Sequence, residues 1–141
     1  MIVDNMDEHG FIRAFHTKLP STVYKWKIHD VHAGGVPDAY YEGEEGNCWI
    51  EYKYVKTLPE KPTSIIKHRL SALQKQWLHR SINNGQRAYV VVGSYQHLVI
   101  LSNKEWEIPL TKEYFERNSL PRSALVNWIT SICTTGHPST L

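Results

Sequence analysis

One short segment, RAYVVVG at Arg87–Gly93, constrains the fold of this chain more than any other. Its apolar residues are mostly β-branched and do not alternate with polar ones, as they would in a strand with one face in water. Such a run is typical of a strand buried on both faces, with helices packed on either side of the sheet. The segment therefore predicts an interior strand of an α/β sheet.

The residues before this segment predict a helix, a three-stranded meander and a second helix. A loose apolar face over about residues 4–18 predicts the first helix. Ser71 is a suitable N-cap for the second helix, which Gly85 ends. The predicted strands are Val23–Asp30, Val36–Tyr41 and Cys48–Val55.

Further elements are expected around the long connection and after the central strand. The connection Lys56–Arg69 is long for a compact domain, and such loops are usually functional or mobile. His97–Ser102 predicts a fifth strand, residues 103–118 give a mixed pattern, and Pro121 predicts the start of a last amphipathic helix containing Trp128. We expect the tail from Thr134 to be loose.

Length and composition limit the class of protein. The 141 residues fit one domain, and 41% apolar with 21% charged residues is close to a globular average. Two cysteines 85 positions apart exclude a disulfide-dense scaffold. The acidic N-terminus lacks the pattern of a signal peptide, and the longest apolar run is far shorter than a membrane span. We therefore expect a cytoplasmic protein without membrane association.

The third predicted strand carries an unusual pair of charges. Side chains alternate along a strand, so Glu51 and Lys53 share one face with Trp49 and Val55. Strands disfavour both charged residue types. An exposed ion pair between neighbours on the strand would explain them, and so would a site that needs both charges.

The second predicted strand favours the site. Pro37-Asp38 opens it, and a short hairpin would place Asp38 beside Glu51. Two close carboxylates are costly unless a cation neutralises them, and Mg²⁺ is commonly held by one or two carboxylates and substrate phosphate. The other interpretation of Asp38 is an ordinary turn residue.

The second predicted helix adds a polar residue to an apolar stripe. Leu70, Leu73, Trp77, Leu78 and Ile82 form that stripe, and Gln74 falls inside it. A Gln that faces inward needs a hydrogen-bonding partner. It is either a satisfied core residue or a group that positions a ligand.

These motifs together resemble a known enzyme family. The matching residues are Gly35-Val36-Pro37-Asp38, Glu51-Tyr52-Lys53 and Ser71-Ala72-Leu73-Gln74 with Gly85, and they resemble the PD-(D/E)xK nuclease superfamily. The resemblance is to its compact branch of Holliday-junction resolvases and stand-alone VRR-NUC domains. It implies a restriction-endonuclease-like α/β core in αβββαβ order, with a mixed sheet flanked by helices. That motif-bearing core would span about residues 8–93 of a single nuclease domain, with a strand and helix extension over about residues 94–134.

The resemblance also implies roles for individual residues. Asp38 and Glu51 would bind Mg²⁺, which Mn²⁺ could replace, together with the backbone carbonyl of Tyr52. Lys53 would position the attacking water or stabilise the phosphate, and Gln74 would support the site or contact DNA. Family members often add an acid from the first helix, for which Glu8 is the first candidate and Asp7 the second.

The distribution of charge supports a nucleic-acid partner. Residues 50–90 contain eight Lys or Arg and two Glu, so their formal net charge is +6. The rest of the chain has a formal net charge of −4. Beside a metal and carboxylate site this excess is typical of phosphate binding, and it favours recognition of DNA structure over sequence. The candidate DNA-binding residues are Lys56, Lys61, Lys67, Arg69, Lys75 and His32.

These patterns lead to one primary hypothesis and two alternatives. We expect an Mg²⁺-dependent endodeoxyribonuclease that resolves branched DNA as a homodimer, with an interface at the C-terminal helix around Trp128 or at exposed aromatics near Trp106. The alternatives are a repair nuclease that trims flaps or ends, and a non-catalytic DNA-binding module. Two histidines, His29 and His32, are too few for a zinc site, and no glycine-rich loop indicates a nucleotide cofactor. A minimal nuclease domain suits a phage.

Overall fold

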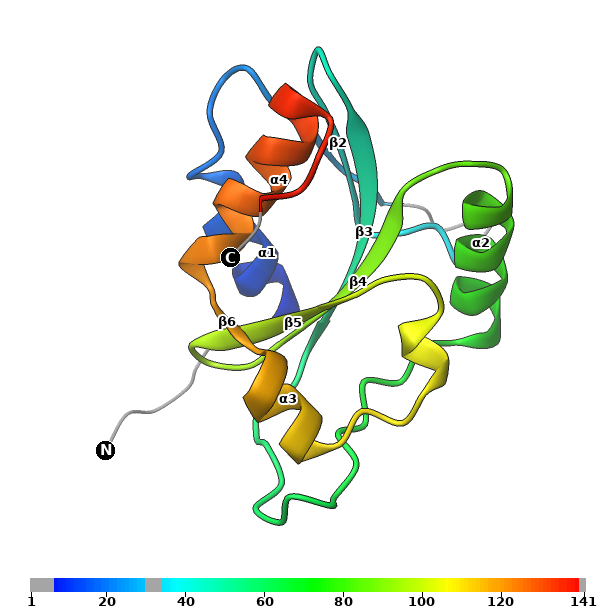
Figure 1. Ribbon diagram of the computed structural model, residues 1–141, viewed down its shortest axis with the longest axis vertical. Helices are drawn as coiled ribbons and strands as arrows, with labels where there is room; N and C mark the ends of the chain where they lie inside the picture. The colour runs from blue at the N-terminus through cyan, green and yellow to red at the C-terminus, as the bar shows by residue number, and fades with distance from the viewer. Residues whose placement is uncertain (1–6, 30–33, 140–141) are drawn as a thin grey trace.

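The computed structural model in Figure 1 describes residues 7–29 and 34–139, built on a mixed six-stranded sheet in the order β1-β2-β3-β4-β5-β6. β3 and β4 pair in parallel, and the other neighbouring strands pair antiparallel. The predicted order of helix, three strands, helix and strand is confirmed. The strands are β1 (Tyr24–Lys27), β2 (Ala39–Glu42), β3 (Asn47–Tyr54), β4 (Ala88–Gly93), β5 (His97–Leu101) and β6 (Leu120–Pro121).

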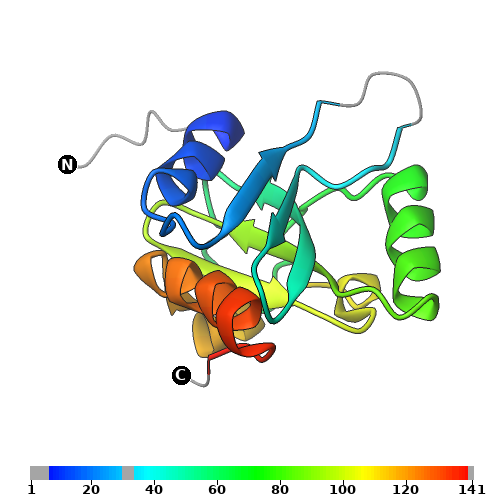
Figure 2. The same ribbon diagram turned by 90° about the horizontal axis from the view of Figure 1, so that it is seen from above.

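Helices cover both faces of the sheet. Helices α1 (Glu8–His16) and α4 (Ser123–Thr135) pack on one face, and α2 (Ala72–Asn83) stands on the other, as Figures 1 and 2 show. The 3₁₀ helix η1 (Glu105–Glu107) and helix α3 (Lys112–Asn118) follow β5. Three of the helices begin with side-chain caps, from Asp7 before α1, Ser71 before α2 and Thr111 before α3.

The β4 strand is buried on both faces, as its sequence predicts. Val90 and Val92 belong to the core under α2, and Val91 belongs to the core under α1 and α4. All three side chains are fully buried. The sheet therefore separates two apolar cores, and β3 and β4 form its centre.

Two glycines allow close approaches that position the candidate site. Gly35 has a φ of 79°, and a Cβ atom there would lie 2.5 Å from the carbonyl oxygen of Leu73 on α2. A Cβ atom on Gly93 would lie 2.0 Å from the ring of Phe11 on α1. The first contact holds the segment before β2 against α2, and the second brings α1 onto the end of β4.

The second strand is shorter than predicted. It begins at Ala39 and not at Val36, so Asp38 lies just before the strand. Pro37 has no N–H to donate to a ladder, and the Tyr52 N–H that a longer strand would pair with is bonded to the side chain of Asp38. The first predicted strand is likewise reduced to the four residues of β1.

The C-terminal third differs from the prediction at both of its boundaries. Pro121 lies opposite His97 in the edge strand β6, where a missing N–H costs nothing, and α4 begins two residues later at Ser123. The expected loose tail from Thr134 is wrong at its start, because α4 continues through Thr135 and ends at Gly136 with a φ of 81°.

Three apolar side chains lie where the sequence did not place them. Leu73, assigned to the buried stripe of α2, is 54% exposed, since it lies over the backbone of Gly34 and Gly35 and not over the sheet. Trp106 is 2% exposed and donates its indole N–H to His79, and Trp128 packs edge-on against Tyr89 inside the core. Neither tryptophan side chain itself offers much surface to a partner, and the expected dimer interface on the C-terminal helix or near Trp106 stays a prediction.

Within residues 7–29 and 34–139, no helix has both the length and the apolar character needed to cross a membrane.

Candidate active site

Asp38 and Glu51 meet at the end of the β2–β3 hairpin. The register pairs Ala39 with Ile50, so the next residues, Asp38 and Glu51, lie opposite each other on the face that α2 shares. Glu51 is only 3% exposed. Burial and the hydrogen-bonded carboxyl of Asp38 raise the pKa of Glu51 far above its ordinary value. Two carboxyl groups this close are stable together only if they share a proton or bind a cation between them.

The backbone of Tyr52 completes the pocket of oxygen atoms. Its N–H donates to Asp38 Oδ2 at 2.8 Å, in the position where a longer β2 strand would have offered a carbonyl group. The N–H and C=O of one strand residue point toward the same side, so the Tyr52 carbonyl also faces the Asp38 edge of β3. This is the orientation that the expected metal ligand requires.

Glu8 and Lys53 complete the charged cluster. Burial raises the pKa of Glu8, the charge of Asp38 raises it further, and the charge of Lys53 lowers it. Lys53 likewise lowers the pKa of Glu51. The second candidate acid, Asp7, has a different task, since its carboxylate accepts the N–H of Gly10 at 2.7 Å as the N-cap of α1.

The cluster fits a hard divalent cation through two carboxylates. In the described part of the chain, no group of three or more His, Cys, Asp or Glu side chains is arranged to hold a metal. Asp38 and Glu51 nevertheless offer oxygen donors only, with the Tyr52 carbonyl on the same edge. Mg²⁺ keeps several waters and needs no more than one or two carboxylates from a protein, so the residues present fit it.

Gln74 has a structural partner. It is half-buried, and its Oε1 accepts the Ser71 N–H at 2.9 Å while Ser71 Oγ accepts the Gln74 N–H at 3.1 Å. This reciprocal pair is a capping box that starts α2. Gln74 thus has the hydrogen-bonding partner that one of its two interpretations requires, and any role of its amide N–H groups in the site stays a prediction.

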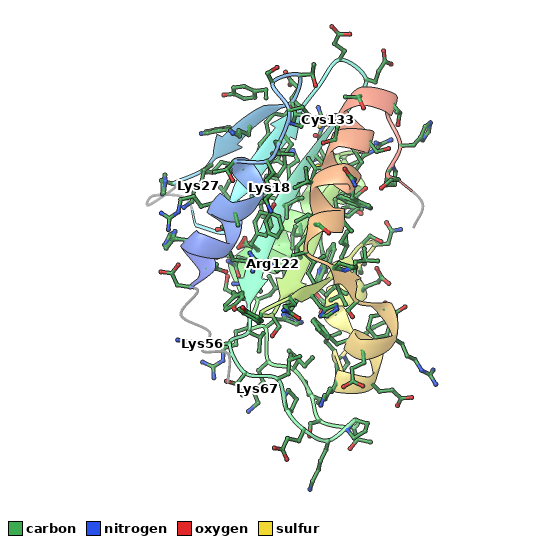
Figure 3. The ribbon with its side chains drawn as sticks, turned by 90° about the vertical axis from the view of Figure 1, so that its left-hand side faces the viewer. Lys18, Lys27, Lys56, Lys67, Arg122 and Cys133 are labelled. Carbon is green, nitrogen blue, oxygen red and sulfur yellow. The ribbon has the colours of Figure 1, made fainter. Side chains whose placement is uncertain are left out.

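The predicted DNA-binding residues lie on or near the connection from β3 to α2. Figure 3 shows Lys56 and Lys67 at the same end of the molecule, both on this connection. Lys61 and Arg69 are also exposed, whereas Lys75 is half-buried and pairs with Glu107 at 3.6 Å. His32 lies outside the described residues.

Sequence reasoning missed His68. This side chain lies on the same connection, its pKa is lowered by burial and by the charges of Lys53 and Lys75, and its Nδ1 is buried without a hydrogen-bonding partner among the described residues. No spacing pattern could have found it, because its neighbours come from β3 and α2.

Comparison with known proteins gives a likeness to solved structures but none to family models or curated sequences. No protein-family model matches the chain, and no curated protein sequence matches it. Among solved structures, Hjc, a Holliday junction resolvase from Archaeoglobus fulgidus, aligns with a TM-score of 0.43 and 13% identity, over 78% of this chain and 96% of that chain. The assignment of a function therefore depends on the residues of the site.

Proposed function

We propose that this chain is a metal-dependent endodeoxyribonuclease of the PD-(D/E)xK type that cuts branched DNA. The observation that carries the proposal is the carboxyl pair formed by buried Glu51 and half-buried Asp38, with Lys53 on the same strand and face as Glu51. A protein that needed only stability would gain nothing from two like charges at this position. The order of the motifs along the chain supports the same family.

Each residue of the cluster has a distinct task in phosphodiester hydrolysis. Asp38, Glu51 and the Tyr52 carbonyl would hold Mg²⁺ or Mn²⁺, and Glu8 would add a carboxylate through a water molecule. The ion would supply charge neutralisation at the phosphate and a water of lowered pKa. Lys53 would orient the attacking water or stabilise the charge that develops on the phosphate oxygens.

The substrate side of the proposal depends on the exposed cations of the β3–α2 connection. Lys56, Lys61, Lys67 and Arg69 would contact phosphates on either side of the cut, because Lys and Arg contacts to phosphate bind DNA without reading its sequence. Two such sites in a homodimer would face the two opposed strands of a junction. Because Trp106 and Trp128 are buried, such a dimer would use exposed residues of the C-terminal helix or exposed aromatics near Trp106.

A panel of labelled DNA molecules tests the proposal. The protein is incubated with a four-way junction, a flap, a linear duplex and a single strand, in Mg²⁺, Mn²⁺ or EDTA. Paired cuts in the junction that disappear in EDTA and in Asp38→Asn support resolution. Flap or end cutting alone would replace it with a trimming nuclease, and binding without cleavage would leave a DNA-binding module.

A further inference from the structure

A second surface lies beside the carboxyl pair, and it consists of aromatic rings. We propose that the aromatic row formed by Trp26, Tyr40 and Trp49 stacks on an unpaired base of the nucleic acid that the carboxyl pair engages. This inference deepens the nuclease proposal and rests on it. It adds a preference for strands that are locally unpaired next to the site of cleavage.

The strand register builds the row. Trp26 lies opposite Tyr40 across β1 and β2, and Tyr40 lies opposite Trp49 across β2 and β3. Directly opposed residues in antiparallel strands have neighbouring side chains on one face. The Tyr40 and Trp49 ring centroids are 4.5 Å apart, so at least this pair is in contact.

The row directly adjoins the candidate active site. Asp38 precedes Tyr40 by two residues, and Glu51 follows Trp49 by two. Residues two apart on a strand share a face and are separated by roughly 7 Å along it. Trp49 and Glu51 are thus consecutive side chains on one face of β3, and Asp38, just before β2, lies opposite Glu51.

The rings are both accessible and held in place. Trp26 is 48% exposed, and Tyr40 and Trp49 are half-buried. On its far side Trp49 meets the ring of Trp77 at 5.1 Å and donates its indole N–H to Gln86 at 3.4 Å. Figure 2 shows α2 on the side of the sheet away from α1 and α4, and the 48% exposure of Trp26 leaves its ring accessible on β1.

The charges around the row favour a base over a phosphate. The hydroxyl of Tyr40 donates to the Glu42 carboxylate at 2.7 Å, and a carboxylate there repels a phosphate. Lys25 and Lys27 alternate with Trp26 and contact His16 and His9 of α1 on the other side of the sheet. Lys25 and Lys27 therefore do not compete for the row, which offers ring faces to a stacked base, while Lys53 and the β3–α2 connection offer cations to the backbone.

Trp26 is the residue to change. Because it is 48% exposed, its replacement should weaken DNA binding without unfolding the protein. Trp26→Phe keeps an aromatic face, whereas Trp26→Leu keeps an apolar side chain without one. Tyr114→Ala is the control, since Tyr114 is another exposed aromatic but lies on α3. Each variant is titrated in EDTA with a duplex that carries a thymidine flap, and with the same duplex in which the flap nucleotides nearest the branch are abasic.

Removing the base from the flap and removing the ring of Trp26 should weaken DNA binding by the same factor. The two changes together should weaken binding no more than either one alone. Wild type, Trp26→Phe and Tyr114→Ala should bind the thymidine flap roughly 5- to 100-fold more tightly than the abasic flap, the usual range for one stacked base. Trp26→Leu should bind both equally, at the abasic level. Wild-type affinity of Trp26→Leu for the thymidine flap would overturn the inference.

Two further outcomes distinguish this inference from a dimer interface and from the nuclease proposal. If Trp26→Leu lowers the sedimentation coefficient and weakens binding to both flaps equally, the row is an interface between two copies, and the inference is wrong. If the difference between thymidine and abasic flaps is present but no DNA is cut in Mg²⁺, the row binds bases as inferred and the nuclease proposal fails alone. Cleavage without any such difference would contradict the inference and leave the nuclease.

Discussion

The backbone N–H of Tyr52 donates to Asp38 Oδ2 at 2.8 Å. This bond replaces the ladder contact that β3 loses where β2 ends, and it fixes the Asp38 carboxylate beside Glu51. The short second strand and the charged cluster are therefore linked. A β2 strand extended back through Pro37 would pair the Tyr52 N–H with the Pro37 carbonyl group and leave the Asp38 carboxylate without this anchor.

Replacing Gly35 with Ala should destabilise the protein and disturb the site. The φ of 79° disfavours any residue with a side chain, and a Cβ atom would lie 2.5 Å from the carbonyl oxygen of Leu73. That oxygen belongs to the backbone of α2, so it cannot move aside as a flexible side chain could. We expect a loss of about 2–4 kcal/mol in the free energy of unfolding, measured by urea denaturation.

Gly85→Ala is the matched control for that change. Gly85 has a similar φ of 84°, but a Cβ atom there would meet nothing within 4 Å. The variant should lose only about 1 kcal/mol, the cost of the left-handed backbone. Equal losses in the two variants would mean that the contact of Gly35 with α2 has no energetic weight.

Glu51→Gln should stabilise the metal-free protein, and more so at high pH. The folded-state pKa of Glu51 is raised, so the folded protein holds this proton more tightly than the unfolded chain does. The stabilisation by the proton is complete below the unfolded pKa of about 4.5 and is lost as the pH rises through the folded pKa. Urea denaturation in EDTA should show a gap between variant and wild type that grows with pH, whereas the exposed Glu60→Gln should show none.

His16 should make the protein sensitive to mild acid. Burial and the charges of Lys25 and Lys27 lower the pKa of His16 to about 4, and its ring bonds the Tyr41 hydroxyl at 2.7 Å. The unfolded chain then binds this proton first, so its contribution is present above about pH 6.5 and is lost as the pH falls toward 4. His16→Gln should flatten the fall of the melting temperature over this interval, and the exposed His97→Gln should leave it unchanged.

Gln74 can be tested for a role beyond capping. Gln74→Glu keeps a capping-box acceptor, so the free energy of unfolding should stay near that of wild type, whereas Gln74→Ala should lose about 1 kcal/mol. We expect Gln74→Glu to cut DNA roughly 10-fold more slowly, because it places a negative charge near the phosphate. If Gln74→Glu cuts DNA at the wild-type rate, Gln74 has no role beyond capping α2.

The sequence predicts the order of the sheet because local patterns determine it. The apolar run of β4, the alternation in β3 and the Ser71 cap each depend on residues close in the chain, and all three are confirmed. The predictions for the start of β2 and for the burial of Leu73 were wrong for one shared reason. Both depend on contacts between segments far apart in sequence, the bond from the Tyr52 N–H to Asp38 in the first case and the packing of Gly34 and Gly35 against α2 in the second.

The candidate site was partly accessible to the same reasoning. Strand alternation and one hairpin suffice to bring Asp38, Glu51 and Lys53 to one place. The neighbourhood of Glu8 depends on how α1 packs across Gly93, and that of His68 depends on the path of the long connection. Neither contact has a periodic signature, and neither does the aromatic row, whose members come from three strands.

The rate of DNA cleavage by Glu51→Gln tests the central claim most directly. Wild-type protein should cut a four-way junction in Mg²⁺ and not in EDTA. Glu51→Gln, shown by its thermal melt to be folded, should cut at least roughly 100-fold more slowly, the scale for loss of one electrostatic catalytic group. A folded Glu51→Gln that cuts the junction at the wild-type rate would contradict the account.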